Sequence, residues 1–187
     1  YFDLSDKINA VVEAVDSIEK VIVVDFKGEG LDASSIHKGV AWNEVINLGE
    51  SEITYVDCDF SDPLYIMYSS GTTGKPKCIV HSVGGTLVNH VKELGLHTNL
   101  KEDTSIFYFT TCGWMMWNWL MSSLYFGSTI VLYEGSPGYP SLGEFLSIIE
   151  REQINIFGTS PKFLKVLEDS DTDLKSIDFS SLEAILS

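Results

Sequence analysis

The chain has 187 residues, and its 12 basic against 27 acidic side chains give a net charge of −15. This balance argues against a partner held through a nucleic acid backbone, because no basic excess is available to form such a face. A hydrophobic content of 44% with 21% charged residues is typical of a globular domain rather than a disordered chain.

Short apolar runs rich in β-branched and aromatic residues alternate along the chain with segments of helical periodicity. The predicted helices cover 5–17, 82–98, 115–126, 141–152 and 160–169. The predicted strands cover 20–26, 64–70, 105–111, 128–134, 154–160 and 182–187. Because the strands are almost continuously apolar, they are expected to be covered on both faces. The pattern predicts an α/β fold with a mainly parallel sheet flanked by helices.

Local signals refine three of the helices. Ser5 is expected to be the N-cap of the first, whose apolar stripe would contain Ile8, Val11, Val12 and Val15. Ser82 is expected to cap the second, and Ser141 with Glu144 has the spacing of a capping box. Residues 27–62 are polar and weakly periodic, so we interpret them as an excursion of the same domain.

Three cysteines at wide, unequal spacing (Cys58, Cys78 and Cys112) do not predict a disulfide framework or a zinc site, and they favour a reducing compartment. The uncharged run 104–133 is interrupted by polar residues and is not a membrane-spanning helix. His90 and His97 lie seven residues apart, but no third metal ligand is close in sequence, so no metal site is expected.

A glycine- and hydroxyl-rich loop, Tyr68-Ser69-Ser70-Gly71-Thr72-Thr73-Gly74-Lys75-Pro76-Lys77, follows the strand 64–70. Its backbone N–H groups, hydroxyls and lysines suit a polyphosphate, and residues 63–92 contain no Asp or Glu. It differs from a Walker loop because Pro76 follows the lysine. The alternative is a surface turn with no ligand. The predicted strand–loop–helix context favours a phosphate-binding loop over such a turn.

This loop resembles the phosphate loop of the adenylate-forming superfamily. Further segments resemble the acetoacetyl-CoA synthetases within it: 63–81, Thr110–Asn118 (TTCGWMMWN), Ile130–Pro140 (IVLYEGSPGYP) and Phe157–Ser160 (FGTS). The resemblance implies that residues 1–187 are a partial AMP-binding domain from the large N-terminal domain of such an enzyme. It is carried by residues 63–187, and 1–62 add little to it. The small C-terminal domain with its catalytic lysine is expected to lie outside this chain, which would be an internal piece that is inactive alone.

The resemblance also implies roles for individual residues. The β- and γ-phosphates of ATP would be held by residues of the loop: Ser70, Gly71, Thr72, Thr73, Gly74 and Lys77. Met115 and Met116 are candidates for the acyl pocket and the thiol approach, together with the flanking Trp114 and Trp117, whereas Trp119 and Met121 are better explained as core. Gly138 would border coenzyme A, although a plain turn explains 135–140 equally well. No catalytic residue is expected within 1–187.

The implied activity is an AMP-forming acid–CoA ligase acting on acetoacetate, with ATP, Mg²⁺ and coenzyme A as co-substrates, in the cytoplasm. No nucleic acid partner and no membrane span are expected. A synthetase for acetate or propionate, or a non-catalytic nucleotide-binding module, are the alternatives. His81 would either shape the phosphate loop or pack at a helix start. A Rossmann oxidoreductase is disfavoured because Gly28 and Gly30 are not followed by a third glycine or a helix start.

Overall fold

The computed structural model describes residues 3–46, 49, 52–69 and 74–187. The chain divides into two compact units, Tyr1–Val56 and Asp57–Ser187, and each is described by itself. In its described part, no helix is long and apolar enough to cross a bilayer.

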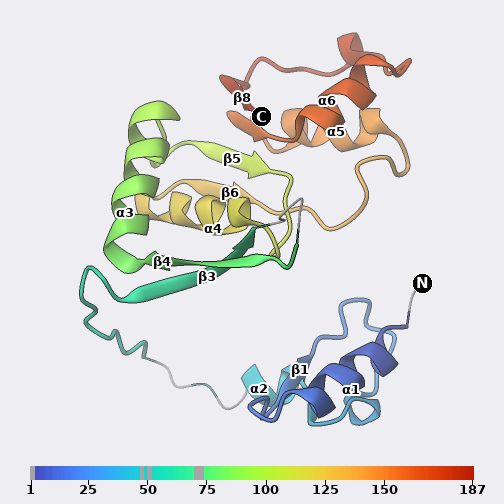
Figure 1. Ribbon diagram of the computed structural model, residues 1–187. Helices are drawn as coiled ribbons and strands as arrows, with labels where there is room; N and C mark the ends of the chain where they lie inside the picture. Colours follow the sequence, from blue (N-terminus) through green and yellow to red (C-terminus); the bar gives the residue numbers. More distant parts are fainter. Residues whose placement is uncertain (1–2, 47–48, 50–51, 70–73) are drawn as a thin grey trace. The chain divides into compact units, whose positions relative to one another are not determined.

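The first unit contains a helix, two short paired strands and a second short helix (Figure 1). Its elements are α1 (Ser5–Ala14), β1 (Val21–Val23), the 3₁₀ turn η1 (Ala33–Ser35), β2 (Gly39–Ala41) and α2 (Trp42–Ile46). The strands β1 and β2 are parallel, with Ile22 opposite Val40. The predicted excursion of 27–62 therefore contributes η1, β2 and α2 to this unit, which the sequence did not predict.

The predicted cap of α1 is wrong. Leu4 occupies the N-cap position without a side-chain hydrogen bond, and Ser5 is the first helical residue. The carboxylate of Asp3 accepts a hydrogen bond from the Ser5 backbone N–H at 2.9 Å, because an acceptor one position before the cap can also satisfy a free amide. Of the predicted stripe, Val12 is buried whereas Val11 is 49% exposed.

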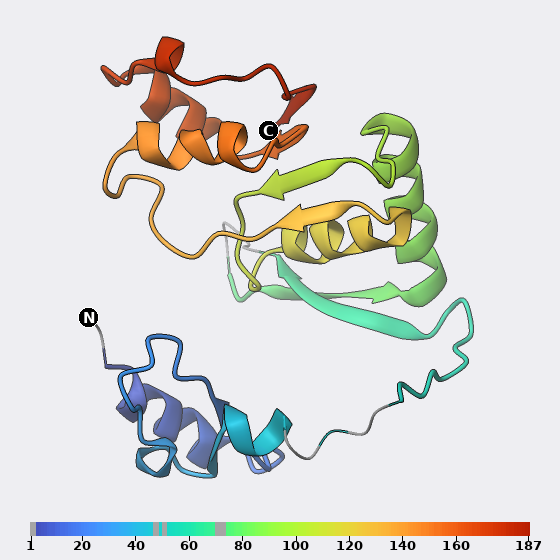
Figure 2. The same cartoon turned by 180° about the vertical axis from the view of Figure 1, so that it is seen from behind.

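The second unit begins with an antiparallel hairpin followed by two helical stretches (Figure 2). The hairpin consists of β3 (Pro63–Ser69) and β4 (Lys77–Ser82). After it come α3 (Val83–Val91) and a π-helical turn η2 (Lys92–His97). A strand of the parallel sheet follows, and then α4 (Met115–Met121) and a 3₁₀ turn η3 (Ser122–Phe126). The helices predicted over 82–98 and 115–126 are thus confirmed in place, each ending in a non-α turn.

A four-stranded parallel sheet forms the centre of this unit, and it confirms the predicted mainly parallel α/β architecture. Its strands are β5 (Ser105–Tyr108), β6 (Thr129–Val131), β7 (Ile156–Gly158) and β8 (Ala184–Leu186), in the order β6-β5-β7-β8. The remaining helical elements are α5 (Leu142–Arg151), α6 (Pro161–Glu168) and the 3₁₀ turn η4 (Leu174–Ser176).

Both faces of the sheet are covered, as the continuous apolar character of its strands predicts. Phe107 and Phe157 face α5, where Phe145 is 1% exposed and meets both rings at 5.8 and 6.3 Å between centroids. Ile106 and Ile156 face the other way and form a second cluster with side chains of η2 and α4. The helix α4 therefore lies against the sheet on the side away from α5.

Capping hydrogen bonds explain where three helices of this unit begin. The Ser82 hydroxyl accepts from Gly85 N–H at 3.1 Å, and the Ser141 hydroxyl accepts from Glu144 N–H at 3.1 Å, so both predicted caps are confirmed. Ser160 caps α6 in the same way, with Pro161 in the first turn.

Candidate nucleotide and acyl site

The predicted phosphate loop connects the two strands of the hairpin. Ser69 and Lys77 are the last pair of the ladder, so the chain between them closes the hairpin. Ser70, Gly71, Thr72 and Thr73 lie outside the described residues. Gly74 has a φ of 155°, which residues with a side chain rarely adopt, and a Cβ placed there would meet nothing within 4 Å.

The two lysines of the loop are available to a ligand. The side chains of Lys75 and Lys77 are exposed, and within the described ranges neither forms a salt bridge. Two uncompensated cations beside a segment without acidic residues produce a local positive potential in an otherwise acidic chain. The loop therefore has the charge that a polyphosphate requires.

The strand–loop–helix context inferred from sequence is wrong in one respect. The strand β4 separates the loop from α3, so Ser82 and the N-terminus of α3 lie at the opposite end of β4. Six residues of strand span about 20 Å. The N-terminus of α3 is therefore too far from this loop for its dipole to act there.

The predicted acyl residues Met115 and Met116 begin α4 directly after the exposed Trp114. Both methionines line a pocket of about 440 Å³, here called the methionine pocket. The pocket is lined by residues of η2, β5, α4 and the end of β8: Glu93, His97, Thr98, Tyr108, Met115, Met116, Trp119, Leu186 and Ser187.

The methionine pocket lies where the strands of the sheet end. Tyr108 is the last residue of β5 and Leu186 is the last of β8, and these strands are parallel members of one sheet. Their carboxyl ends therefore share an edge, which is where open α/β sheets bind ligands. Burial raises the pKa of the Tyr108 phenol, and its hydroxyl donates to the Thr159 carbonyl at 3.5 Å.

The other aromatic candidates have different positions. Trp114 is 67% exposed, and neither Trp114 nor Trp117 lines the pockets described here. The sequence favours a core position for Trp119. It lies in the core with 5% of its surface exposed, and its indole also forms part of the wall of the methionine pocket.

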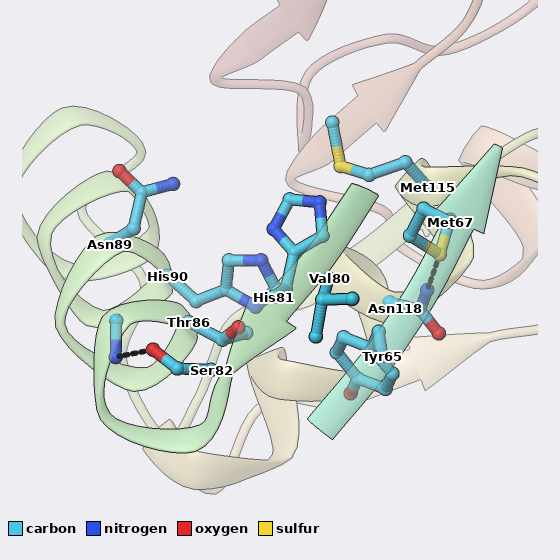
Figure 3. A pocket seen from close by; sticks show the side chains of 11 residues that line it. Tyr65, Met67, Val80, His81, Ser82, Thr86, Asn89, His90, Met115 and Asn118 are labelled. Carbon is cyan, nitrogen blue, oxygen red and sulfur yellow. Dashed lines mark hydrogen bonds between the residues drawn. The ribbon is translucent and has the colours of Figure 1, made fainter. Parts of the chain in front are cut away.

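A second pocket, here called the hairpin pocket, has a volume of about 320 Å³ and lies between the hairpin, α3 and α4 (Figure 3). Tyr65 and Met67 reach it from β3, and His81 reaches it from β4. The Asn118 amide donates to the Met67 sulfur at 3.2 Å, which joins α4 to the hairpin. Met115 lines both pockets and so lies at the boundary between them.

His90 forms a buried part of the wall of the hairpin pocket. Its Nδ1 lies 2.8 Å from the hydroxyl of Ser122, which donates its proton to the Asn118 carbonyl at 3.2 Å. The hydroxyl has one proton, so it accepts from Nδ1–H and leaves Nε2 as the free acceptor. Burial lowers the pKa of His90, nearby His81 lowers it further, and Glu93 opposes the shift. His90 is therefore neutral at pH 7.

The remaining sequence candidates have plainer environments. Gly138 is exposed in a turn closed by a hydrogen bond from Tyr139 N–H to Ser136 carbonyl at 3.0 Å, so the predicted turn is confirmed. Across the described residues, no group of three or more potential ligands gathers to hold a metal ion. His97 is exposed and lines the methionine pocket, whereas His90 lines the hairpin pocket.

Sequence reasoning missed Glu93, Tyr108 and His97 at the methionine pocket. Tyr108 could have been found, because it lies near the carboxyl end of a predicted parallel strand. Glu93 gave no such signal, since its place in the wall depends on the π-helical turn that follows α3.

Comparison with known proteins identifies the family. The family model of the AMP-binding enzymes matches residues 2–187. The chain belongs to the AMP-binding enzyme family. It is 44% identical over 176 residues to an acetoacetyl-CoA synthetase of Danio rerio, covering 90% of this chain and 26% of that protein. An acetoacetyl-coenzyme A synthetase of Rhizobium meliloti is 39% identical, with 99% of this chain and 29% of that protein covered.

A solved structure of acetoacetyl-CoA synthetase from Streptomyces lividans matches with a TM-score of 0.84 and 35% identity, covering 98% of this chain and 28% of that one. The anthranilate CoA ligase AuaEII, solved with anthranoyl-AMP, has the same fold over 96% of this chain, with a TM-score of 0.68 and 24% identity. The chain thus spans between a quarter and a third of the length of these relatives.

Proposed function

We propose that the full-length protein containing this chain is an AMP-forming acid–CoA ligase that converts acetoacetate, ATP and coenzyme A to acetoacetyl-CoA, AMP and pyrophosphate. The observation that carries this proposal is the likeness to the Streptomyces lividans acetoacetyl-CoA synthetase over 98% of the chain. The two methionines predicted from the resemblance also line one pocket at the carboxyl edge of the sheet, which supports a site there.

The reaction has two steps. In the first, the carboxylate oxygen of the acid attacks the α-phosphorus of ATP, forming the acyl-adenylate and releasing pyrophosphate. In the second, the thiol sulfur of coenzyme A attacks the acyl carbon, AMP leaves with the electron pair of the broken C–O bond, and the thiol proton is lost. Neither step needs a nucleophile from the protein, so the chain contributes positioning and charge neutralisation.

The phosphate loop would hold the β- and γ-phosphates of ATP, which arrives as its magnesium complex. Backbone N–H groups and hydroxyls of residues 70–74 would donate to phosphate oxygens, and the Lys77 ammonium would neutralise the charge of the departing pyrophosphate. Lys75 is equally exposed, but it occupies a more variable position in the family's loop. We therefore assign the larger role to Lys77.

The methionine pocket would receive the carbon chain of the acid, with Met115 and Met116 as its walls. Trp114 and Trp117 would flank the approach of the thiol, and Gly138 would border coenzyme A. The proposed setting is the cytoplasm, where acid, ATP and coenzyme A are available in solution. The partners are small molecules, and neither a nucleic acid nor a membrane surface is invoked.

Acetoacetate-dependent exchange of labelled pyrophosphate into ATP tests the first step in the full-length protein. We expect robust exchange with acetoacetate and weaker exchange with acetate, propionate and butyrate. The isolated 187-residue chain is expected to give none. A preference for acetate or propionate would replace the substrate assignment, nucleotide binding without exchange would point to a binding module, and exchange by the isolated chain would refute its predicted inactivity.

A further inference from the structure

A hydrogen bond between Glu93 and Trp119 stabilises the wall of the methionine pocket, and neither residue is among the predicted acyl residues. After α3, the chain forms the six-residue π-helical turn η2, in which Leu94 is completely buried. Turns of this π-helical kind are rare in proteins, and those that occur are often found at functional sites. At the end of this turn, Thr98 donates both its backbone N–H and its hydroxyl to the Glu93 carbonyl, at 2.9 and 3.0 Å. The backbone of Glu93 is therefore firmly placed.

The side chain of Glu93 satisfies a buried donor on α4. The indole N–H of Trp119 donates to Oε2 of Glu93 at 3.1 Å, and the Trp119 side chain is 5% exposed. A buried indole N–H needs a partner, and an ionised acceptor makes the stronger bond. Lys92 lies 3.7 Å from the other carboxylate oxygen, which partly compensates the charge of Glu93.

Trp119 transmits this constraint to the pocket. Its ring meets the edge of Tyr108 at 6.1 Å between centroids, and Met116 packs against the same cluster. Tyr108, Met116 and Trp119 all line the methionine pocket. The direction of the indole ring therefore sets the position of the apolar wall.

We infer that Glu93 is a positioning residue of the acid-binding pocket, acting through Trp119 to fix the wall that receives the apolar end of a short carboxylic acid. This inference rests on the proposed function.

The test compares Glu93→Ala, Glu93→Gln and Trp119→Phe in the full-length protein by acid-dependent pyrophosphate exchange. Glu93→Ala leaves the indole without its acceptor, and we expect the KM for acetoacetate to rise about tenfold. The KM for ATP is expected to stay unchanged, because the phosphate loop is not involved. Glu93→Gln keeps an acceptor oxygen and should restore most of the affinity for the acid.

Glu168→Ala is the matched control, since it removes an exposed carboxylate of α6 that pairs only at the surface with Lys165. It should leave both KM values unchanged. In a Trp119→Phe background, Glu93→Ala should add no further increase, because the two residues act as one unit. The near-ultraviolet circular dichroism of the tryptophans should change in Glu93→Ala and recover in Glu93→Gln.

Equal KM values for acetoacetate in Glu93→Ala and Glu168→Ala would overturn the inference, as would a parallel rise in the KM for ATP. If Glu93→Ala does not fold, an unchanged acid KM in Trp119→Phe overturns it instead. The wild-type assay comes first and decides the proposed function: without exchange on any short acid both proposals fail. If the wild-type protein shows normal exchange and the Glu93 variants have the same KM for acetoacetate, only the proposed role of Glu93 is refuted.

Discussion

The hairpin that carries the phosphate loop and the sheet that carries the methionine pocket are stabilised in different ways. All three residues of β7 are buried, and α5 and α4 cover the two faces of the sheet. In β3, by contrast, side chains alternate between half-buried and exposed, with Ile66 61% and Tyr68 68% exposed. The loop proposed to bind the phosphates thus belongs to the less buried element, whereas the pocket proposed for the acid lies at the edge of the covered sheet.

The largest expected effect comes from a substitution that creates a cavity beside the covered sheet. Phe145→Ala would remove a ring that is 1% exposed and contacts Phe107, Phe157 and Phe163. We expect a loss of about 3–5 kcal/mol in the free energy of unfolding. Ile66→Ala on the hairpin should cost far less, because the isoleucine is already mostly exposed. Amide hydrogen exchange of the two elements in the full-length protein measures both losses, and equal losses would contradict the comparison.

Charge removal at the hairpin tests function without altering the core. Lys77→Ala should lower the pyrophosphate exchange rate about a hundredfold, since it removes the cation that we propose neutralises the developing phosphate charge. The melting temperature should not change, because the side chain is exposed. Lys75→Ala is the matched control and should have the smaller effect. Full nucleotide affinity and full exchange in Lys77→Ala would contradict the phosphate assignment.

Two glycines offer a matched pair of steric probes. A Cβ at Gly158 would lie 1.9 Å from Cδ2 of Tyr108, and one at Gly84 would lie 2.0 Å from Cδ2 of Phe60. Tyr108 is held in the sheet, so Gly158→Ala should cost about 1–3 kcal/mol and disturb the pocket. The Phe60 ring is 66% exposed and can swing away, so Gly84→Ala should cost less. Thermal unfolding compares the two variants, and the reverse order would show that the hairpin side is the more rigid.

The smallest expected effect is a pH dependence at His90. Its pKa is lowered in the folded state, first by burial, so the unfolded chain binds the proton more readily. Stability from this group is present above the ordinary histidine pKa of 6.5 and is lost as the pH falls below it. His90→Gln should flatten the dependence of melting temperature on pH between 7.5 and about 5.5. A pH dependence of the melting temperature that survives His90→Gln would refute the assignment.

The parallel sheet could be predicted from sequence because its strands are short apolar runs between helical segments, as in 105–111 and 154–160. The strand β4 could not, because only Cys78, Ile79 and Val80 are apolar in it and charged or polar residues flank them. Its pairing with β3 depends on a register that no local pattern encodes. The strand β2 is shorter still, at three residues, and gives no periodicity.

The site was predictable to the extent that a local motif carries it. Met115 and Met116 are adjacent in sequence and follow a recognisable Gly113-Trp114 pair, so the resemblance located them. Glu93 lies 26 positions from Trp119, and the two meet only after α3 passes into its π-helical turn and α4 packs on the sheet. Contacts of this kind arise from tertiary packing, which neither composition nor spacing describes.

The hairpin register has a consequence for the whole site. Tyr65 is paired with His81, and Ser69 is paired with Lys77, so all four side chains lie on one face of the hairpin. If β4 shifted by one residue along β3, the side chains of β4 would move to the opposite face of the hairpin. This shift would withdraw His81 from the hairpin pocket and re-aim the Lys77 ammonium at the same moment. An insertion or deletion within β4 is therefore expected to damage the hairpin pocket and the phosphate loop together, even though His81 and Lys77 are both retained.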